Sequence, residues 1–580
     1  MKPARAAALA AIAAVLVLAA VVAWLAHLGL DARRHLLAAR EAALRVEHAL
    51  LAGDPAQAHS ELDRVQREVA DARSDTSGPL WWLAKQVPYA GRTPRTVTGL
   101  VAAVGVTADA VLPDLVRAGE ALDPTKVSAT RIDLALQPLL TSHDSLAAAG
   151  TRLAEVRRSL TSLPSYGVIR PVDQARTRVV NQLATLATDV SRAQTAVALA
   201  PDILGWHGPR RYLLAMQNNA ESRGTGGLMG IWGILAVDDG RPRLAQLGTI
   251  EDLPTTPVDV SALGAGYTNL YGDDPALWAN ANESPNFPDA AQLWLAMWRH
   301  RTGVQLDGVI AIDPVGLSYL MKVIGPVTMS DGTRITARTE VSVVEQQAYD
   351  RFPDNAARKR WLRELSRSVF TAMQRRHYNS RSLLLALARG ARQQRVLAYS
   401  AHPTEQSLLA DSPLAGTLPQ GPGPFVSVVV DNAAGNKLDY YLRRRLTYAL
   451  GTCTAGARRS TVTVQLFNDV PARPLPAYVT TRHDAGGDRT AGSSKLLVYV
   501  VLTQGAAVTG VHLDGVSTHV VTGSERGHPV VELPVELRAH QTRQIVLHLL
   551  EPAYPQRPTV RVQPLVAPQQ TDVIAQRCGS

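Results

Sequence analysis

The sequence predicts a multidomain α+β protein with an N-terminal transmembrane helix, a helical region, a central α/β region and a β-rich C-terminal region. Three observations support this fold class. The chain has 580 residues, more than one hydrophobic core usually covers. Hydrophobic residues make up 46% and charged residues 19%, which excludes a largely disordered chain. The spacing of apolar residues changes along the chain from helical to alternating.

The N-terminal segment, residues 6–30, contains no Asp, Glu, Lys or Arg. At about 1.5 Å per helical residue it is long enough to cross a hydrocarbon core of about 30 Å. Lys2 and Arg5 precede it, and Trp24 lies near its far end, where an aromatic anchor is expected. We therefore predict a cytoplasmic end at residues 1–5, a single-pass helix in the plasma membrane and an ectodomain outside the cytoplasm. A cleaved signal peptide is the alternative, but its apolar part is normally shorter.

Residues 31–200 predict a helical stalk or bundle. They are rich in Ala, Leu, Arg and Glu, and their apolar residues lie three or four positions apart, as Leu62, Val65 and Val69 do. The pair Trp81-Trp82 either rests against the bilayer or is buried in the bundle, and burial is the simpler interpretation.

The remaining chain divides into two regions and a connection. Residues 201–410 alternate strand-like and helix-like segments, which predicts a sheet covered by helices. Residues 425–580 carry short apolar segments separated by turn residues, which predicts a β-sandwich-like domain. Residues 411–424 are rich in Pro and Gly and are predicted to be a linker.

The charge and the cysteines limit the possible partners. The formal net charge is +10, and arginine-rich surfaces suit anionic partners such as phosphates and lipid head groups. The basic residues are scattered and form no nucleic-acid-binding module, so we expect no nucleic-acid partner. Two cysteines, Cys453 and Cys578, exclude a disulfide-dense scaffold. Outside the cytoplasm they can pair, and two unpaired thiols are the alternative.

Generic catalytic motifs are absent from the sequence, so candidate site residues come from unusual polar segments. Residues 217–227 follow a predicted strand and combine amides, a carboxylate, an arginine and three glycines. Residues 278–288 contain two more asparagines, and residues 306–313 contain two aspartates. Backbone N–H groups in a Gly-rich turn can hold an anion, and carboxylates can hold a metal or activate a hydroxyl.

These segments, together with Gly325-Pro326-Val327 and residues 435–441, resemble the uncharacterised bacterial family catalogued as domain of unknown function 4012. The blocks appear in the family's order over roughly residues 35–480. This family implies no function by itself.

The central region also resembles, more distantly, the LytR-CpsA-Psr transferases, which move polyprenyl-pyrophosphate-linked glycopolymers onto the bacterial cell wall. Those enzymes likewise have one transmembrane helix and an extracytoplasmic catalytic domain. The likeness rests on Arg223-Gly224-Thr225, on Glu251-Asp252 after a strand and on Asp307 before another. Thr225 and Glu251 depart from the R-S-D and R-D patterns of those enzymes, so one aspartate and one arginine of their site are missing.

The resemblance implies a site in which arginines bind pyrophosphate and aspartates bind Mg²⁺. Asp252 and Asp307 are the candidate catalytic residues and metal ligands. The candidate substrate-binding residues are Asn218, Asn219, Arg223, Gly226, Gly227, Asn280, Asn282, Arg358 and Arg360. Structural alternatives exist for them: turn glycines, an Arg223–Glu221 ion pair, a hydrogen-bonded loop and a solvated helix face.

Three functions follow from these observations and stay open. The first is an envelope enzyme acting on a polyprenyl-pyrophosphate glycan or cell-wall polymer, which requires Arg223, Asp252 and Asp307 to converge. The second is a protein that binds an anionic lipid or glycan without turnover. The third is a scaffolding protein of the envelope that binds protein partners.

Overall fold

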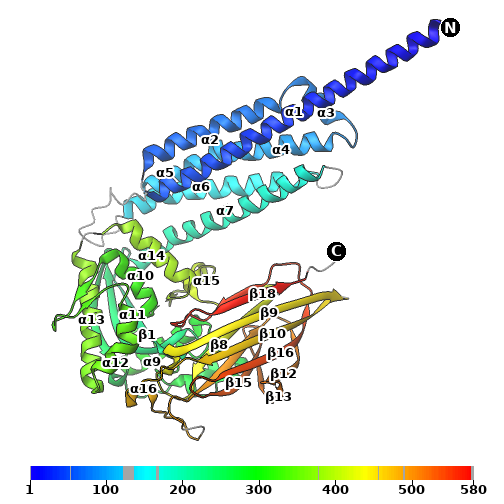
Figure 1. Ribbon diagram of the computed structural model, residues 1–580. Helices are drawn as coiled ribbons and strands as arrows, with labels where there is room; N and C mark the ends of the chain where they lie inside the picture. The colour runs from blue at the N-terminus through cyan, green and yellow to red at the C-terminus, as the bar shows by residue number, and fades with distance from the viewer. Residues whose placement is uncertain are drawn as a thin grey trace. The chain divides into compact units, whose positions relative to one another are not determined.

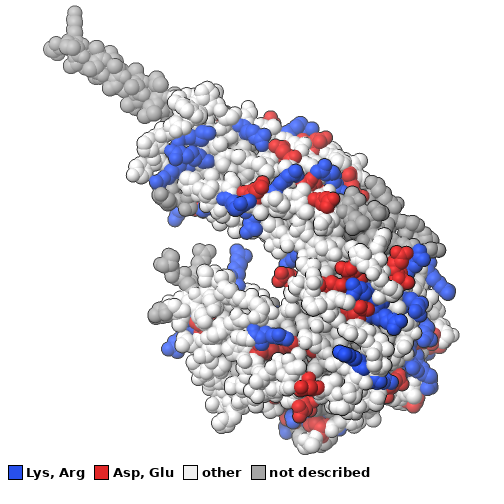
Figure 2. Space-filling view, turned by 180° about the vertical axis from the view of Figure 1, so that it is seen from behind, with Lys and Arg blue, Asp and Glu red and all other residues white. Residues whose placement is uncertain are grey.

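The computed structural model describes residues 2–52, 54–121, 136–164, 169–376, 378–454, 456–486 and 490–576. The chain forms two compact units (Figure 1). We call the first, within residues 1–202, the helical unit, and the second, which begins at Ile203, the mixed unit. Basic and acidic side chains are interspersed on the face shown in Figure 2.

The helical unit confirms the prediction of helices in the N-terminal part of the chain. Its elements are α1 (Lys2–Ala52), α2 (Pro55–Asp75), α3 (Pro79–Gln86), α4 (Arg92–Val106), η1 (Thr107–Val111), α5 (Leu112–Ala121), α6 (Leu136–Thr161) and α7 (Arg170–Ile203). Helix α2 begins at Pro55, and the Asp54 side chain accepts the N–H of Gln57. Apolar residues at helical spacing, such as Val46 of α1 and Val65 of α2, form the core between these helices.

The predicted transmembrane segment, residues 6–30, lies within α1. The side chains of residues 1–20 lie outside the described part, so membrane insertion stays a prediction. Among the described residues, one helical stretch, Arg92–Glu120, is long and apolar enough to cross a membrane by length and composition. Its Leu100 and Val111 pack in the core of the helical unit, which by itself accounts for an apolar helix there.

The mixed unit contains a five-stranded sheet with the strand order β3-β2-β1-β4-β7. The strands are β1 (Arg210–Arg223), β2 (Gly226–Asp238), β3 (Arg241–Thr249), β4 (Gly308–Ile312) and β7 (Val396–Ser400). Strand β1 pairs antiparallel with β2 and parallel with β4. Because side chains alternate along a strand, Leu213 and Ala215 pack with α9 (Phe287–Thr302) on one face. Leu214 and Met216 point to the other face.

Helices cover this second face of the sheet. They are α10 (Pro314–Ile324), α11 (Glu340–Ser342), η5 (Val343–Gln347), α12 (Ala348–Arg351), α13 (Asn355–Arg375) and α14 (Ser380–Arg392). Met321 of α10 and Leu365 of α13 share a hydrophobic cluster with Ile231 of β2. The alternating strand and helix pattern therefore does form a helix-covered sheet, in which the strand pairing is partly parallel and partly antiparallel.

Two further sheets form the C-terminal part, with the orders β13-β12-β16-β10-β9-β18 and β14-β15-β11-β8-β17. The strands are β8 (Phe425–Asn432), β9 (Leu442–Thr454), β10 (Ala457–Asn468), β11 (Ser494–Leu502), β12 (Ala507–Leu513), β13 (Val516–Ser517), β14 (Val521–Glu525), β15 (His528–Leu537), β16 (Thr542–Pro552), β17 (Thr559–Val562) and β18 (Gln570–Ala575). Val428 and Val498 of one sheet pack with Leu446 and Leu547 of the other in one core.

Residues 411–424, predicted to be a linker, are packed rather than free. Leu418 is 2% exposed and belongs to the same core as Phe287 of α9 and Phe425 of β8. Its N–H donates to Asn286 Oδ1 at 3.0 Å, and the Phe287 N–H donates to Gly416 O at 3.1 Å. One core thus runs from the five-stranded sheet into one of the two C-terminal sheets, β14-β15-β11-β8-β17, so the predicted boundary does not separate independent cores.

Cys453 of β9 is bonded in a disulfide, and Arg458 donates to its sulfur from Nε at 3.4 Å. Cys578 lies outside the described residues, so the pairing of Cys453 with Cys578 stays a prediction.

We predict that Leu418→Ala lowers the free energy of unfolding of the mixed unit by about 2–5 kcal/mol, because it leaves a cavity in the shared core. Leu408→Ala, at a side chain that is 39% exposed, is the control and should cost far less. Urea denaturation followed by tryptophan fluorescence measures both. If the C-terminal sheets unfolded in a transition of their own and Leu418→Ala had no effect, the shared core would be refuted.

Candidate functional site

The end of β1, Gln217–Arg223, leaves regular strand pairing, and we call it the β1 extension. The register shifts between Met216 and Gln217 and again between Asn218 and Ser222, so residues 219–221 have no partner on β2. The carboxylate of Glu345 accepts the free N–H groups of Asn219 at 3.0 Å and Ala220 at 2.7 Å. Burial raises the pKa of Glu345 to about 8, and the two N–H donors act against that shift.

The β1 extension is also bonded to the C-terminal sheets. Ser222 donates to Asp439 Oδ2 from its N–H at 2.8 Å and from its hydroxyl at 2.6 Å. Arg223 Nη1 donates to the Asn432 carbonyl at 3.1 Å, and Gln563 Nε2 donates to the Arg223 carbonyl at 2.8 Å. These bonds satisfy buried polar groups, as folding requires. They indicate that much of this polar segment is structural.

Arg223 and the predicted amide residues hold the turn between β1 and β2. Arg223 is 6% exposed, and its Nη2 donates to Asn280 Oδ1 at 2.9 Å. Its ion pair with Glu221, at 3.5 Å, is the structural alternative that the sequence left open. Asn282 Nδ2 donates to Thr225 Oγ1 at 2.8 Å and to the Gly227 carbonyl at 2.9 Å.

The predicted glycines serve the backbone of the same turn. Gly226 has φ 136°, a conformation that side chains disfavour. A Cβ atom on Gly227 would lie 2.2 Å from the Asn218 carbonyl oxygen. Asn219 Nδ2 donates to the Pro564 carbonyl at 2.9 Å. These contacts give each residue a structural role without an anion.

The two candidate catalytic aspartates lie elsewhere. Asp307 Oδ2 accepts the Arg211 N–H at 2.7 Å at the start of β1, while Arg223 ends the same strand. At about 3.3 Å per residue along a strand, Asp307 and Arg223 are more than roughly 20 Å apart. Asp252 Oδ2 accepts the Thr249 N–H at 2.7 Å, beside the outer strand β3. The predicted convergence of the three side chains is therefore wrong, and the two aspartates share no metal site.

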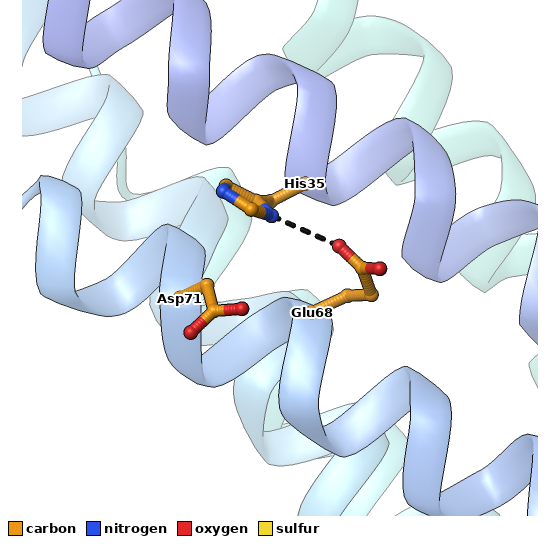
Figure 3. A group of neighbouring side chains, drawn as sticks. All are labelled: His35, Glu68 and Asp71. Carbon is orange, nitrogen blue, oxygen red and sulfur yellow. Dashed lines mark hydrogen bonds and ion pairs between the residues drawn. The ribbon is translucent and has the colours of Figure 1, made fainter.

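The described residues contain one group of three side chains with metal-ligand spacing, and it lies in the helical unit (Figure 3). Ligand atoms of His35, Glu68 and Asp71 lie within 4.8 Å of one another. His35 Nδ1 is 2.9 Å from Glu68 Oε2, and this hydrogen bond raises the pKa of His35. A hydrogen-bonded histidine between two carboxylates, which joins α1 to α2, accounts for the group. The three-residue spacing of Glu68 and Asp71 is its only sequence signal.

A cavity of about 450 Å³ lies in the mixed unit between the sheet and α10, α13 and α14. Its wall is mainly aliphatic, and examples are Leu214, Met216, Ile310, Leu317, Leu362 and Val369. The volume is within the range of about 300–1,000 Å³ that is typical of small-molecule sites. The sequence did not reveal this cavity, because cavity-lining and core residues share the same apolar spacing.

Charged side chains line the cavity where α13 begins and where the β1 extension ends. Lys437 forms an ion pair with Glu221, and Lys359 Nζ lies 3.1 Å from Glu251 Oε1. Of the two predicted binding residues on α13, Arg358 lines the cavity, whereas Arg360 is exposed and does not.

Aromatic rings and an amide complete this charged side. The Arg358 guanidinium lies 3.9 Å from the ring centroid of Tyr478 and 4.8 Å from that of Tyr349. Asn218, another predicted binding residue, donates from Nδ2 to the Tyr349 hydroxyl at 2.7 Å and lines the cavity. Arg358 also donates from Nη1 to the Phe352 carbonyl at 3.0 Å and from Nη2 to Asn355 Oδ1 at 2.6 Å. Stacking and these two hydrogen bonds hold it in place, rather than a carboxylate.

Glu340 is a buried carboxyl group in the cavity wall. It is 0% exposed, and neither of its oxygens has a hydrogen-bond partner. Burial raises its pKa well above the ordinary value, and Glu345 and Asp313 act in the same direction. Burial therefore favours the protonated form of this carboxyl group, and that form can donate a hydrogen bond into the cavity.

Comparison with known proteins gives one result. Residues 207–349 match the family model described as Protein of unknown function (DUF4012). This match supports the resemblance to the DUF4012 family that the sequence indicated. The matched range contains the β1 extension, Glu340 and Glu345, whereas Arg358, Lys359 and Lys437 lie beyond it. No curated protein and no solved structure matches the chain.

We predict that Arg223→Ala destabilises the mixed unit by about 3–5 kcal/mol. The change leaves the carbonyls of Ser222 and Asn432 and Oδ1 of Asn280 without their donor, and it removes one of the two cations that pair with buried Glu221. Arg360→Ala, at an exposed arginine, should change the free energy of unfolding by less than about 0.5 kcal/mol. Urea denaturation measures both. A fully stable Arg223→Ala variant would contradict the structural role and return Arg223 to the list of binding candidates.

We predict that Glu340→Gln makes the melting temperature of the mixed unit less sensitive to a rise in pH from 5 to 8. The folded pKa of Glu340 is raised, so its stabilising contribution is complete below about pH 4.5 and is lost as pH rises through the folded pKa. The difference between variant and wild-type melting temperatures should therefore grow from pH 5 to pH 8. Asp411→Asn, at an exposed carboxylate, should leave that difference constant. An equal offset of Glu340→Gln at both pH values would be the opposing result.

Proposed function

We propose that this protein is a single-pass, membrane-anchored protein of the bacterial cell envelope whose mixed unit binds a lipid-linked anionic glycan outside the cytoplasm. The ligand class is a polyprenyl pyrophosphate that carries a glycan. The observation that carries this proposal is the cavity, which combines an aliphatic wall with a charged end.

The aliphatic wall suits a hydrocarbon chain. Sheet residues such as Leu214 and Ile310 face helix residues such as Leu317 and Val369 across the cavity, and none of these side chains offers a hydrogen bond. Each methylene that a chain buries there contributes roughly 0.8 kcal/mol. Part of a polyprenyl chain is therefore enough to give useful affinity.

The charged end suits a phosphate-containing head group. Three cations, Arg358, Lys359 and Lys437, line this end of the cavity. The two lysines pair with Glu221 and Glu251. Of the other two carboxyl groups in the wall, Asp313 pairs with Arg395, and burial favours the protonated form of Glu340. Among the described residues, Arg358 has no carboxylate partner, so it is the cation available to a phosphate. A pyrophosphate can replace the carboxylates as the partner of the two lysines, since ammonium groups bind either oxyanion. Arg358 is already oriented by its aromatic neighbours and needs no rearrangement.

Binding without turnover is the form of this function that the geometry favours. Asp307 lies at the other end of β1, and Asp252 is bonded to Thr249 and does not line the cavity. Glycopolymer transfer with these residues as catalysts has no support from their placement. A scaffolding role has no specific observation in its favour.

The cavity can be blocked to test the hydrocarbon site. Ser366 of α13 lines the cavity, and Ser368 on the same helix does not. We predict that Ser366→Trp weakens binding of a short polyprenyl pyrophosphate at least about tenfold, because the indole fills the space that the chain needs. Ser368→Trp is the matched control and should bind as the wild type does.

Thermal shift of the full chain in detergent reads out this binding. A ligand at 100 times its Kd stabilises the folded state by about 2.7 kcal/mol, so wild type and Ser368→Trp should shift and Ser366→Trp should not. Equal shifts in all three proteins would mean that the polyprenyl chain binds outside this cavity. No shift in any of them would reject the proposed ligand class.

The head-group end has its own test. We predict that Lys359→Ala weakens binding of the pyrophosphate several-fold and leaves binding of the uncharged polyprenol unchanged, because only the former needs the cation. Arg360→Ala, one residue along α13, is the control. A parallel loss of affinity for both ligands in Lys359→Ala would indicate damage to the fold rather than loss of a phosphate contact.

A further inference from the structure

Helix α3 and the turn after it expose an unusual set of apolar side chains. The exposed fractions are 40% for Leu80, 56% for Trp82, 55% for Leu83, 47% for Val87 and 78% for Tyr89. Large apolar side chains that gather in one short surface segment mark an interaction site more often than isolated ones do. The partner of this segment has to be deduced from its support, its charge and its position.

Helix α3 is anchored to the rest of the helical unit, so its apolar side chains are exposed on an ordered segment. Trp81 is 4% exposed, and its indole N–H donates to Thr98 Oγ1 at 2.9 Å. Arg95 Nε donates to the Lys85 carbonyl at 2.6 Å and so ties the end of α3 to α4. The two tryptophans of the pair thus have different roles: Trp81 anchors α3 in the bundle, and Trp82 points away from it.

The charge of the segment has one sign. Between Pro79 and Arg95 the charged residues are Lys85, Arg92 and Arg95, and no Asp or Glu occurs. The Arg92 guanidinium lies 5.1 Å from the ring centroid of Tyr89, so basic and aromatic groups are adjacent. Aromatic rings with Lys and Arg beside them are typical of segments that lie in the head-group region of an anionic bilayer.

The position of α3 beside α1 agrees with a bilayer as the partner. A Cβ atom on Gly29 of α1 would lie 3.6 Å from Cη2 of Trp81, so the two helices touch there. Gly29 is next to the last residue of the predicted membrane segment, 6–30. Figure 1 shows α3 beside α1 where α1 extends beyond the other helices of the bundle. The exposed side chains are therefore level with the point at which α1 would leave the bilayer.

We propose that Pro79–Arg92 docks into the head-group region of an anionic leaflet, next to the membrane-spanning part of α1. Trp82, Leu83 and Tyr89 enter the interface, and Lys85 and Arg92 contact lipid phosphates. This proposal rests on the membrane anchor in the proposed function. Two attachment points fix the orientation of the helical unit relative to the bilayer, which one helix crossing the membrane does not.

The test uses the full chain reconstituted into vesicles of phosphatidylglycerol and phosphatidylcholine. An environment-sensitive fluorophore is attached at Trp82→Cys and, as the control, at Leu44→Cys. Leu44 is 46% exposed on the same helical unit but lies farther along α1 from the membrane segment. The label at position 82 should shift to the blue and be quenched by lipids that carry a nitroxide near the head group, at least about twice as strongly as the label at position 44.

Each outcome separates the docking surface from the anchor. Flotation of the vesicles tests the anchor alone, and a chain that does not float overturns both proposals. If the chain floats and the label at 82 is as exposed to water as the label at 44, only the docking surface is rejected. A blue shift at 82 without nitroxide quenching assigns the surface to a protein contact, such as a second copy, and also overturns the proposal.

A charge variant checks the lipid preference. Replacing Lys85 and Arg92 together by Gln should reduce nitroxide quenching at position 82 in anionic vesicles to the level that wild type has in purely zwitterionic vesicles. Arg95 is left unchanged, because it ties α3 to α4. Equal quenching in both vesicle types with wild type would contradict the proposed contacts with anionic lipid.

Discussion

The architecture of the mixed unit depends on how the unpaired N–H groups of the β1 extension are satisfied. Because residues 219–221 do not pair with β2, the N–H groups of Asn219 and Ala220 lack a strand partner in the protein interior. A buried donor without an acceptor is destabilising. Glu345 supplies both acceptors from η5, and Asp439 does the same for Ser222 from η7 (Leu438–Tyr441). One strand end therefore fixes the helical cover of the sheet on one side and the C-terminal sheets on the other. The same segment contributes Gln217, Asn218 and Glu221 to the cavity wall.

Much of the fold follows from local patterns in the sequence. Helical spacing in residues 31–200 and alternation after residue 425 reflect single elements that bury one face, and such patterns are read without knowledge of partners. The predicted linker illustrates the limit. Pro and Gly residues mark irregular backbone, but only the tertiary structure determines that Leu418 is buried between Phe287 and Phe425. Periodicity likewise does not separate Leu213, in the core, from Leu214, on the cavity.

The candidate site was harder to predict, because rare polar segments have structural as well as chemical uses. Arg223 and Asn282 are conspicuous in the sequence, yet their donors are used to hold the β1–β2 turn. Arg358 and Asn218 were candidates because of the family resemblance and not because of any cavity, and both line the cavity. Asp307 shows why spacing alone misleads: parallel pairing of β1 and β4 places it beside Arg211, at the strand end opposite Arg223.

In the proposed function, a polyprenyl chain occupies the cavity between the sheet and α13. The most direct measurement is photo-crosslinking of the full chain with a short polyprenyl pyrophosphate that carries a diazirine at its hydrocarbon end, followed by peptide mass spectrometry. We expect crosslinks to the cavity-facing part of α13, between Leu362 and Met373, and we expect excess unlabelled ligand to remove them. If the crosslinks that unlabelled ligand removes lay only in the C-terminal sheets or in the helical unit, the proposed cavity site would be contradicted.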